Sequence, residues 1–263
     1  MHLSVAARTD VGMIRAGNED AFFADANEQR GVFIVADGMG GHAAGEVASE
    51  MAVQIVTREL SSVTSLMGDE PTARVAAALQ LANKAIYERT LAEVDKQGMG
   101  TTASVLLLGG ARYLIGQVGD SRIYMLRNGV LHQVTKDHSY VQEQVDAGYL
   151  TPEQARYHPY SNVITRCVGA GDSVEPDTYA GQVLMGDLFL VASDGLTGMV
   201  DDRRIAQLLL ARTTPARMVE NLIREANGRG GLDNITAIVV QIVGVEDGEG
   251  AATTQVFTPP QGG

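Results

Sequence analysis

Residues 102–134 read TASVLLLGGARYLIGQVGDSRIYMLRNGVLHQV, and they carry the clearest fold signal in the chain. Two glycine-containing pairs, Gly109-Gly110 and Asn128-Gly129, interrupt the apolar segments and favour tight hairpin turns. Strands joined by such short turns pair antiparallel. The pattern predicts an antiparallel meander of four strands, over residues 102–108, 112–118, 121–127 and 130–134.

Outside this stretch, strands and helices come in groups. Short apolar runs predict strands over residues 3–8, 32–36 and 235–243, and a strand pair over 184–192. Helical spacing predicts helices over residues 43–60, 71–91, 202–211 and 215–226, with irregular helical structure over 136–160. A doubly wound parallel sheet would need strict alternation of strands and helices. The sequence therefore predicts an α+β fold, with two antiparallel sheets covered by helical hairpins.

The composition predicts a single folded domain. The chain has 263 residues, of which 45% are hydrophobic and 20% are charged, so it can bury a substantial core. We expect this domain to span residues 1–243. Residues 244–263 are first acidic and then rich in Gly, Thr and Pro, and are expected to form a disordered tail or linker.

Charge and cysteine content exclude several classes of protein. The net charge is −12, whereas nucleic-acid binding requires positive charge, so no nucleic-acid partner is expected. The single cysteine, Cys167, excludes an internal disulfide and multi-cysteine metal sites. No apolar run reaches the roughly 18 residues of a membrane span, and the charged N-terminal region does not resemble a secretory signal. We expect a cytoplasmic monomer.

Four aspartates lie where an apolar segment meets a glycine or a tight turn: Asp37, Asp120, Asp194 and Asp233. Any one of them alone is typical turn chemistry. If the strand ends coincide, however, the four carboxylates converge, and two charges 4 Å apart repel by roughly 4 kcal/mol at an effective dielectric of 20. Such a cluster needs protons or cations. Oxygen ligands without thiolates select hard ions such as Mg²⁺, Mn²⁺ or Ca²⁺, and their dispersal over several strands favours a catalytic site.

A second charged segment contains Arg15, Glu19 and Asp20. By default these are solvated surface charges. Beside a cluster of metal-binding carboxylates, the planar guanidinium of Arg15 suits a phosphate group. Glu19 and Asp20 could then hold metal-bound waters as a second layer of ligands.

Eight short segments occur in the order typical of one enzyme family, and the similarity covers residues 3–243. They are RAGNED (15–20), ADGMGGH (36–42) with GE (45–46), GTT (100–102), GDSR (119–122), TKDH (135–138), ITR (164–166), SDG (193–195) and DN (233–234). The sequence strongly resembles the metal-dependent serine/threonine protein phosphatases, the type 2C or PPM family, and especially its compact bacterial members.

The resemblance implies a central antiparallel β-sandwich flanked by helices on both faces, with a binuclear Mn²⁺ or Mg²⁺ site at one end. By motif position, Asp37 would bridge the two ions and the Gly38 carbonyl would bind the second. Asp194 and Asp233 would bind the first ion. Arg15 would bind the substrate phosphate.

Bacterial relatives often carry a third ion, which Asp120 and Asp194 would hold here, and residues 137–163 match a mobile flap beside the site. One position departs from many eukaryotic members, which have a histidine, proposed as the general acid, where this chain has Met39. A thioether cannot donate a proton. His42 is a possible acid, although a helix-start or capping role is an alternative, and a metal-bound water is another source of the proton.

The implied activity is hydrolysis of phosphoserine and phosphothreonine monoesters by a metal-activated water, without a phosphoenzyme. Phosphorylated proteins, substrates of serine/threonine kinases, would be the partners. The alternative from a different class is a catalytically silent domain that binds phosphoproteins or acts as a scaffold. Such a domain would be expected to lose metal ligands, and every ligand position is present.

Three other enzyme classes fit less well. Residues 38–43 match a dinucleotide-binding fingerprint, but Asp37 would then face a pyrophosphate and Glu59 lies within a predicted helix. A cysteine phosphatase needs an arginine six residues after Cys167, where Ser173 stands. A serine hydrolase needs the G-x-S-x-G motif, which is absent.

Overall fold

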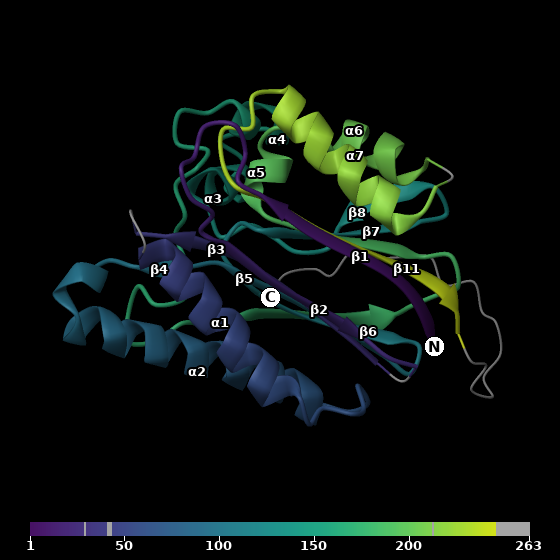
Figure 1. The fold of residues 1–263 in the computed structure, drawn as a ribbon, viewed down its shortest axis with the longest axis horizontal. Coiled ribbons are helices and arrows are strands. Elements are labelled where there is room, and N and C mark those ends of the chain that lie inside the picture. Colours follow the sequence, from purple (N-terminus) through teal and green to yellow (C-terminus); the bar gives the residue numbers. More distant parts are fainter. Residues whose placement is uncertain (29, 41–43, 212, 246–263) are drawn as a thin grey trace.

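The structure, a computed structural model, describes residues 1–28, 30–40, 44–211 and 213–245. These residues form four layers, in which two stacked antiparallel sheets lie between helices on either side (Figure 1). The predicted α+β sandwich flanked by helices is therefore confirmed. Residues 246–263, most of the predicted tail, lie outside the described residues.

The first sheet has five strands in the order β1-β11-β10-β7-β8, and every neighbouring pair is antiparallel. Its strands are β1 (His2–Asp10), β11 (Ile235–Gly244), β10 (Leu188–Ala192), β7 (Arg122–Arg127) and β8 (Val130–Gln133). The second sheet has the order β2-β3-β5-β6-β9, with β4 paired to β3. Its strands are β2 (Asp20–Ala26), β3 (Arg30–Met39), β5 (Ala103–Gly109), β6 (Arg112–Val118), β9 (Asp177–Gln182) and β4 (Gly100–Thr101).

Helices cover the outer face of each sheet. On the second sheet lie α1 (Ala44–Leu60) and α2 (Glu70–Ala92), followed by a short 3₁₀ turn, η1 (Val94–Lys96). On the first sheet lie α5 (Asp194–Thr197), α6 (Asp202–Leu209) and α7 (Pro215–Gly228). The remaining helices, α3 (Tyr140–Asp146) and α4 (Pro152–Arg156), belong to the segment between β8 and β9.

Three buried apolar clusters join the four layers, because successive side chains of a strand face opposite sides of its sheet. In β3, Val32 and Ile34 pack toward α1 and α2, whereas Phe33 and Val35 pack between the sheets. The third cluster lies between the first sheet and α5–α7. Burial on both faces explains why the central strands read as nearly continuous apolar runs.

The predicted meander over residues 102–134 is wrong at its midpoint. The two hairpins β5–β6 and β7–β8 exist, but they belong to different sheets. Between them the chain crosses the sandwich through Gly119, whose φ of +103° favours glycine, and a Cβ there would come within 2.6 Å of Thr102. The turn after β6 is therefore a crossover, which the turn signals did not distinguish from a hairpin.

The predicted strand pair over residues 184–192 is also wrong, since only β10 lies in that range. Strands β2 and β9 were not predicted. Both lie at an edge of the second sheet and are only partly buried, so they lack the apolar runs of central strands. The predicted helical region over 136–160 contains only the short helices α3 and α4, and the four-residue α5 was missed.

The strand registers bring one end of each sheet to a common place. In the first sheet, Asp10 pairs with Ile235, and Ala192 pairs with both Ala237 and Arg122. In the second, Asp20 pairs with Asp37, and Ala103 pairs with Val118. The described segments that carry predicted site residues therefore leave their sheets at this end of the sandwich. In the part of the chain that the structure describes, no helix is long and apolar enough to cross a membrane.

Candidate active site

The first pair of acidic residues is set by the register of β2 and β3. Asp20 and Asp37 are directly opposite each other on neighbouring strands. Like charges directly opposite in an antiparallel pair destabilise it. This register nevertheless belongs to a well-packed sheet, so the repulsion is tolerated at this position.

Asp194 and Asp233 reach the same place from the first sheet. Asp194 is the first residue of α5, which follows β10, and Asp233 lies just before β11. Gly195 lets the two segments approach, because a Cβ there would lie 1.9 Å from the Asn234 carbonyl oxygen. Asp194 is close enough to Asp37 to share a hydrogen bond with it.

Asp120 completes the group from the crossover between β6 and β7. Its turn is fixed by Gln117, whose amide donates to the carbonyl oxygens of Gly119 and Ser121 at 3.0 and 2.7 Å. Asp120 is 6% exposed, and its charge acts on both Asp37 and Cys167. The structure thus brings together all four aspartates predicted from the sequence, with Asp20 as a fifth.

Burial and mutual repulsion shift the pKa values of these carboxyl groups upward. For Asp37 and Asp120, burial raises the pKa well above the usual range, and neighbouring aspartates raise it further. Burial also raises the pKa of Asp194. The pKa of Asp20 rises to about 7 through burial, although hydrogen bonds from Thr236 and Ser193 act in the opposite direction.

Three of these carboxylates retain a buried oxygen without a hydrogen-bond partner: the Oδ1 atoms of Asp20, Asp120 and Asp194. Buried polar atoms are nearly always paired, so three unpaired carboxylate oxygens at one place need a reason. No three acidic, histidine or cysteine side chains of the described residues already form a metal-ligand sphere, and Asp37 shares a hydrogen bond with Asp194. All of these candidate ligands are oxygen atoms, which suit a hard divalent ion. Such an ion would replace the proton that Asp37 and Asp194 share.

Arg15 lies at the open side of the cluster. Its Nη2 donates to Asp233 Oδ2 at 2.6 Å, and half of the Arg15 side chain is exposed. In this arrangement the guanidinium neutralises a carboxylate that is expected to bind a metal ion. The exposed donors of Arg15 can still meet a phosphate from solvent.

A residue whose role sequence reasoning missed, Asn234, holds Arg15 in place. The Asn234 amide donates to the carbonyl oxygens of Val11 and Gly17, both at 2.9 Å, and its Oδ1 accepts from the Glu19 backbone at 2.7 Å. One side chain therefore fixes both ends of the loop that carries Arg15. The sequence signals were its place in the DN segment of the family resemblance and its position beside Asp233 at the start of an apolar strand.

Two hydroxyl pairs fix the acidic strand ends, and their roles were also missed. Ser193 and Thr236 donate to Asp20 Oδ2 at 2.8 and 2.6 Å. The Thr102 hydroxyl accepts from the Asp37 backbone at 2.9 Å, and the Thr101 hydroxyl donates to the Asp37 carbonyl oxygen at 2.9 Å. These bonds position the carboxylates without neutralising them.

Two further predicted site residues, Gly38 and Glu19, lie in the described part of the chain next to helix α1. Gly38 lies in β3, where a Cβ would come within 2.1 Å of the Gly45 carbonyl oxygen, so only glycine fits. The Glu19 carboxylate lies near Gly45, and the Glu19 carbonyl oxygen accepts from the Gly38 amide and the Ser49 hydroxyl. His42, the predicted possible acid, lies outside the described residues.

The segment expected to form a flap, residues 137–163, is fastened at its base. Arg122 binds Asp137 through both nitrogens of one edge, at 2.6–2.9 Å, and the two ends of the segment pair through Ser139 and Ile164. Between these ends lie α3 and α4. The base is thus tied to the turn that carries Asp120, and the mobility of the segment stays a prediction.

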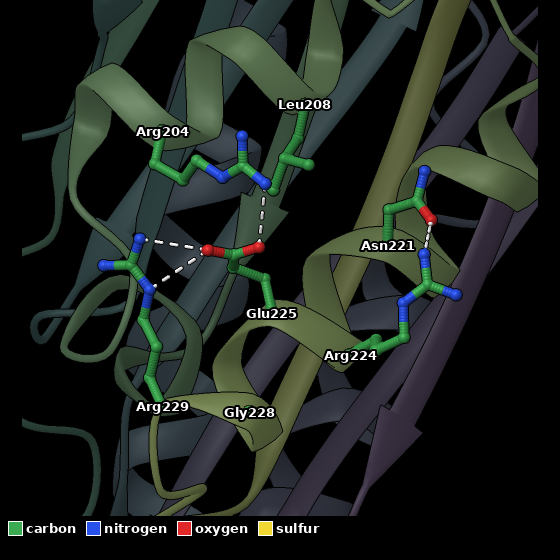
Figure 2. A pocket seen from close by; sticks show the side chains of 7 residues that line it. All are labelled: Arg204, Leu208, Asn221, Arg224, Glu225, Gly228 and Arg229. Atoms are coloured by element: carbon green, nitrogen blue, oxygen red, sulfur yellow. Dashed lines mark hydrogen bonds and ion pairs between the residues drawn. The ribbon is translucent and has the colours of Figure 1, made fainter.

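A hollow of about 360 Å³ lies elsewhere, on the outer face of α6 and α7, and none of the acidic cluster lines it (Figure 2). Figure 2 shows Glu225 between Arg204 and Arg229, each within 3.0 Å of it, while Arg224 turns toward Asn221. These charges satisfy one another and join α6 to the end of α7. The chemistry is therefore assigned to the acidic cluster and not to this hollow.

Comparison with known proteins agrees with the fold. The family model Protein phosphatase 2C matches residues 15–226. The serine/threonine phosphatase stp of Listeria monocytogenes is 40% identical over 237 residues, which are 89% of this chain and 94% of that protein. The serine/threonine protein phosphatase PstP of Mycobacterium tuberculosis is 40% identical over 94% of this chain, which matches 46% of that longer protein.

Solved structures give the same result. The S. agalactiae serine/threonine phosphatase is 38% identical and superposes with a TM-score of 0.86 over 92% of this chain and all of that chain. The catalytic domain of PstP, solved in complex with two manganese ions, is also 38% identical, with a TM-score of 0.81 over 92% of this chain and 99% of that chain. The fold is that of the metal-dependent phosphatases. The chain belongs to the protein phosphatase 2C family.

Proposed function

We propose that this protein removes phosphate from phosphoserine and phosphothreonine side chains of proteins, with Mn²⁺ or Mg²⁺ as its cofactor. The observation that carries the proposal is the group of buried aspartates with unpartnered oxygens beside a half-exposed arginine. Family membership supports it, since the relatives named above are serine/threonine phosphatases and one was solved with two manganese ions.

The proposed ligands divide between the two sheets. Asp37 would bridge two ions, with the Gly38 carbonyl on the second ion and with Asp194 and Asp233 on the first. Asp120 would hold a third ion together with Asp194. The unpartnered Oδ1 atoms of Asp120 and Asp194 support this division, because each is buried and lacks any other partner.

Bound ions would supply the positive charge that lowers the pKa of a water nucleophile and stabilises the phosphoryl group in its transition state. The protein's own residues position the substrate. Arg15 would orient the phosphate through its exposed guanidinium donors, and Asn234 would keep Arg15 in register with the aspartates. Asp20, held by Ser193 and Thr236, has a pKa near 7 in the metal-free site and could exchange a proton there.

Met39, the residue after Gly38, cannot protonate the leaving oxygen, because its thioether has no exchangeable proton. His42 and a metal-bound water therefore both stay open as sources of the proton. Opposition to serine/threonine kinases, a monomeric state and a cytoplasmic location are further parts of the proposal. Sedimentation and cell fractionation test the last two.

Phosphate release from a phosphothreonine peptide, with and without Mn²⁺, tests the proposal. Purified protein should release phosphate with Mn²⁺ and stop when EDTA is added. Arg15→Ala should raise KM for the peptide, because it removes a phosphate contact, whereas Arg204→Ala on the outer face should not. Binding of the peptide without any phosphate release would instead favour the silent phosphoprotein-binding domain.

A further inference from the structure

Two loops beside Arg15 expose large apolar side chains. Val11, Met13 and Ile14 lie in the loop between β1 and β2, and Leu232 lies in the loop before β11. Their exposed fractions are 38%, 66%, 67% and 56%. We call these four residues the apolar rim. Single exposed apolar residues are ordinary, but four on two touching loops form a patch that needs an explanation.

The two loops of the apolar rim are in direct contact. The Met13 backbone donates to the Gly231 carbonyl oxygen at 2.8 Å, and a Cβ on Gly231 would lie 2.8 Å from Met13 Cγ. Gly12 also lies close to Asp233, since a Cβ at position 12 would be 2.2 Å from the Asp233 carbonyl oxygen. Glycines at these positions, both with positive φ, allow the two loops to touch. The loops that carry Met13 and Leu232 are thereby held side by side.

The apolar rim is also fixed relative to the site. Ile14 is next to Arg15 in the chain and Leu232 is next to Asp233, and these two charged residues share an ion pair of 2.6 Å. Asn234 bonds to the Val11 carbonyl oxygen. Because this surface is held in place, a ligand that binds it does not bear the cost of ordering the loops.

We infer that the apolar rim binds an apolar side chain next to the phosphorylated residue of the substrate, and so gives the enzyme a sequence preference. This inference rests on the proposed function. When the phosphate is on Arg15, the Cα atoms one or two positions away lie within about 8 Å of the Cα of the phosphorylated residue, because consecutive Cα atoms are 3.8 Å apart. Acidic neighbours are disfavoured, since the chain carries a net charge of −12.

Five peptides test the preference in the full-length enzyme with Mn²⁺. One has phosphothreonine flanked only by glycine and serine, and four carry a single leucine at position −2, −1, +1 or +2. At least one leucine should raise kcat/KM about tenfold, which is the gain expected when a protein pocket accepts one apolar group. The preference is measured as the ratio of kcat/KM for a leucine peptide to kcat/KM for the glycine–serine peptide. A change in the chemical step affects both peptides equally and cancels in this ratio.

A triple variant, Met13→Ser, Ile14→Ser and Leu232→Ser, should reduce this ratio to about one. The matched control is Leu91→Ser, Val130→Ser and Met185→Ser, which removes three exposed apolar side chains from other surfaces and should keep the ratio. Backbone bonds between the loops are unaffected by either set of changes.

The possible failures are distinguishable. If the wild-type enzyme hydrolyses none of the peptides, the proposed function itself fails. If it hydrolyses all five equally, or if the rim variant keeps the preference, the function stands and the inference is overturned. Sedimentation of both variants provides a further test: a wild-type dimer that becomes monomeric only in the rim variant, without a change in preference, would assign the rim to a second copy of the chain.

Discussion

The two ends of the β-sandwich treat buried aspartates in opposite ways. At one end, Asp187 is 2% exposed and accepts from Arg127 Nε at 2.8 Å and Nη2 at 2.5 Å, and also from the Leu184 backbone. At the other end, Asp120 and Asp20 are 6% and 9% exposed and Asp194 is half-buried, but each keeps a buried oxygen with no partner. The same residue type is fully satisfied at one end and left short of partners at the other.

This difference separates structure from function. A carboxylate that has an arginine and a backbone amide as partners contributes to the stability of the fold. Carboxylates that repel one another cost free energy in the metal-free state and are expected to recover it only when a cation binds. Perturbed carboxyl groups at one place are typical of functional sites.

The largest contrast is expected in catalysis. Asp37→Asn should lower kcat at saturating Mn²⁺ by about a thousandfold, or about 4 kcal/mol, because the residue is expected to serve two ions. Asp187→Asn, at the opposite end, should keep the activity of each folded molecule. Steady-state kinetics on a phosphopeptide measure both, and an Asp37→Asn enzyme with a tenth of the wild-type kcat would argue against a bridging role.

Loss of Asp187 should affect the stability of the fold, although it should not affect catalysis. Asp187→Ala should lower the free energy of unfolding by about 3 kcal/mol, because it leaves the largely buried Arg127 without a carboxylate, with only the Gln182 carbonyl oxygen as acceptor. Lys84→Ala, which removes an exposed pair with Glu88, should change it by less than about 0.5 kcal/mol. Urea unfolding followed by circular dichroism gives both values. Equal losses in the two variants would mean that the Arg127–Asp187 pair does not stabilise the fold.

The acidic end should also make the metal-free protein sensitive to pH. Asp20 has a folded-state pKa of about 7, raised above the ordinary value near 4, so the folded state binds a proton that the unfolded chain has lost. Stability from this group is therefore present below about pH 4 and is lost as pH rises toward 7. In EDTA, the free energy of unfolding should fall by about 2 kcal/mol between pH 5.5 and 7.5.

Asp20→Asn should reduce this pH dependence, because an amide does not titrate, while Asp37, Asp120 and Asp194, whose pKa values are also raised, keep the rest of it. Urea unfolding at the two pH values in EDTA measures it. A wild-type protein that becomes more stable over the same range would contradict the raised pKa at this end of the sandwich.

The sequence predicted the layers of the fold because central strands and long helices have strong apolar periodicity. It did not predict β2 and β9, whose edge positions leave them half exposed, nor the crossover at Gly119, where a turn signal does not reveal which sheet the next strand joins. The convergence of Asp37, Asp120, Asp194 and Asp233 was predictable because each follows or precedes a buried strand. The roles of Asn234 and Ser193 were not, since they depend on contacts between distant segments.

The central claim is that the unpartnered carboxylates are a cation site, and the effect of Mn²⁺ on the melting temperature tests it without any substrate. At a hundred times its Kd, one bound ion stabilises the folded state by about 2.7 kcal/mol. For a chain of this length, that corresponds to a rise of roughly 5–10 °C. The rise should shrink in Asp37→Asn and Asp233→Asn and persist in Arg15→Ala, which removes the guanidinium from Asp233 but no ligand. Absence of any rise in the wild-type protein, or its loss in Arg15→Ala with retention in Asp37→Asn, would contradict the claim.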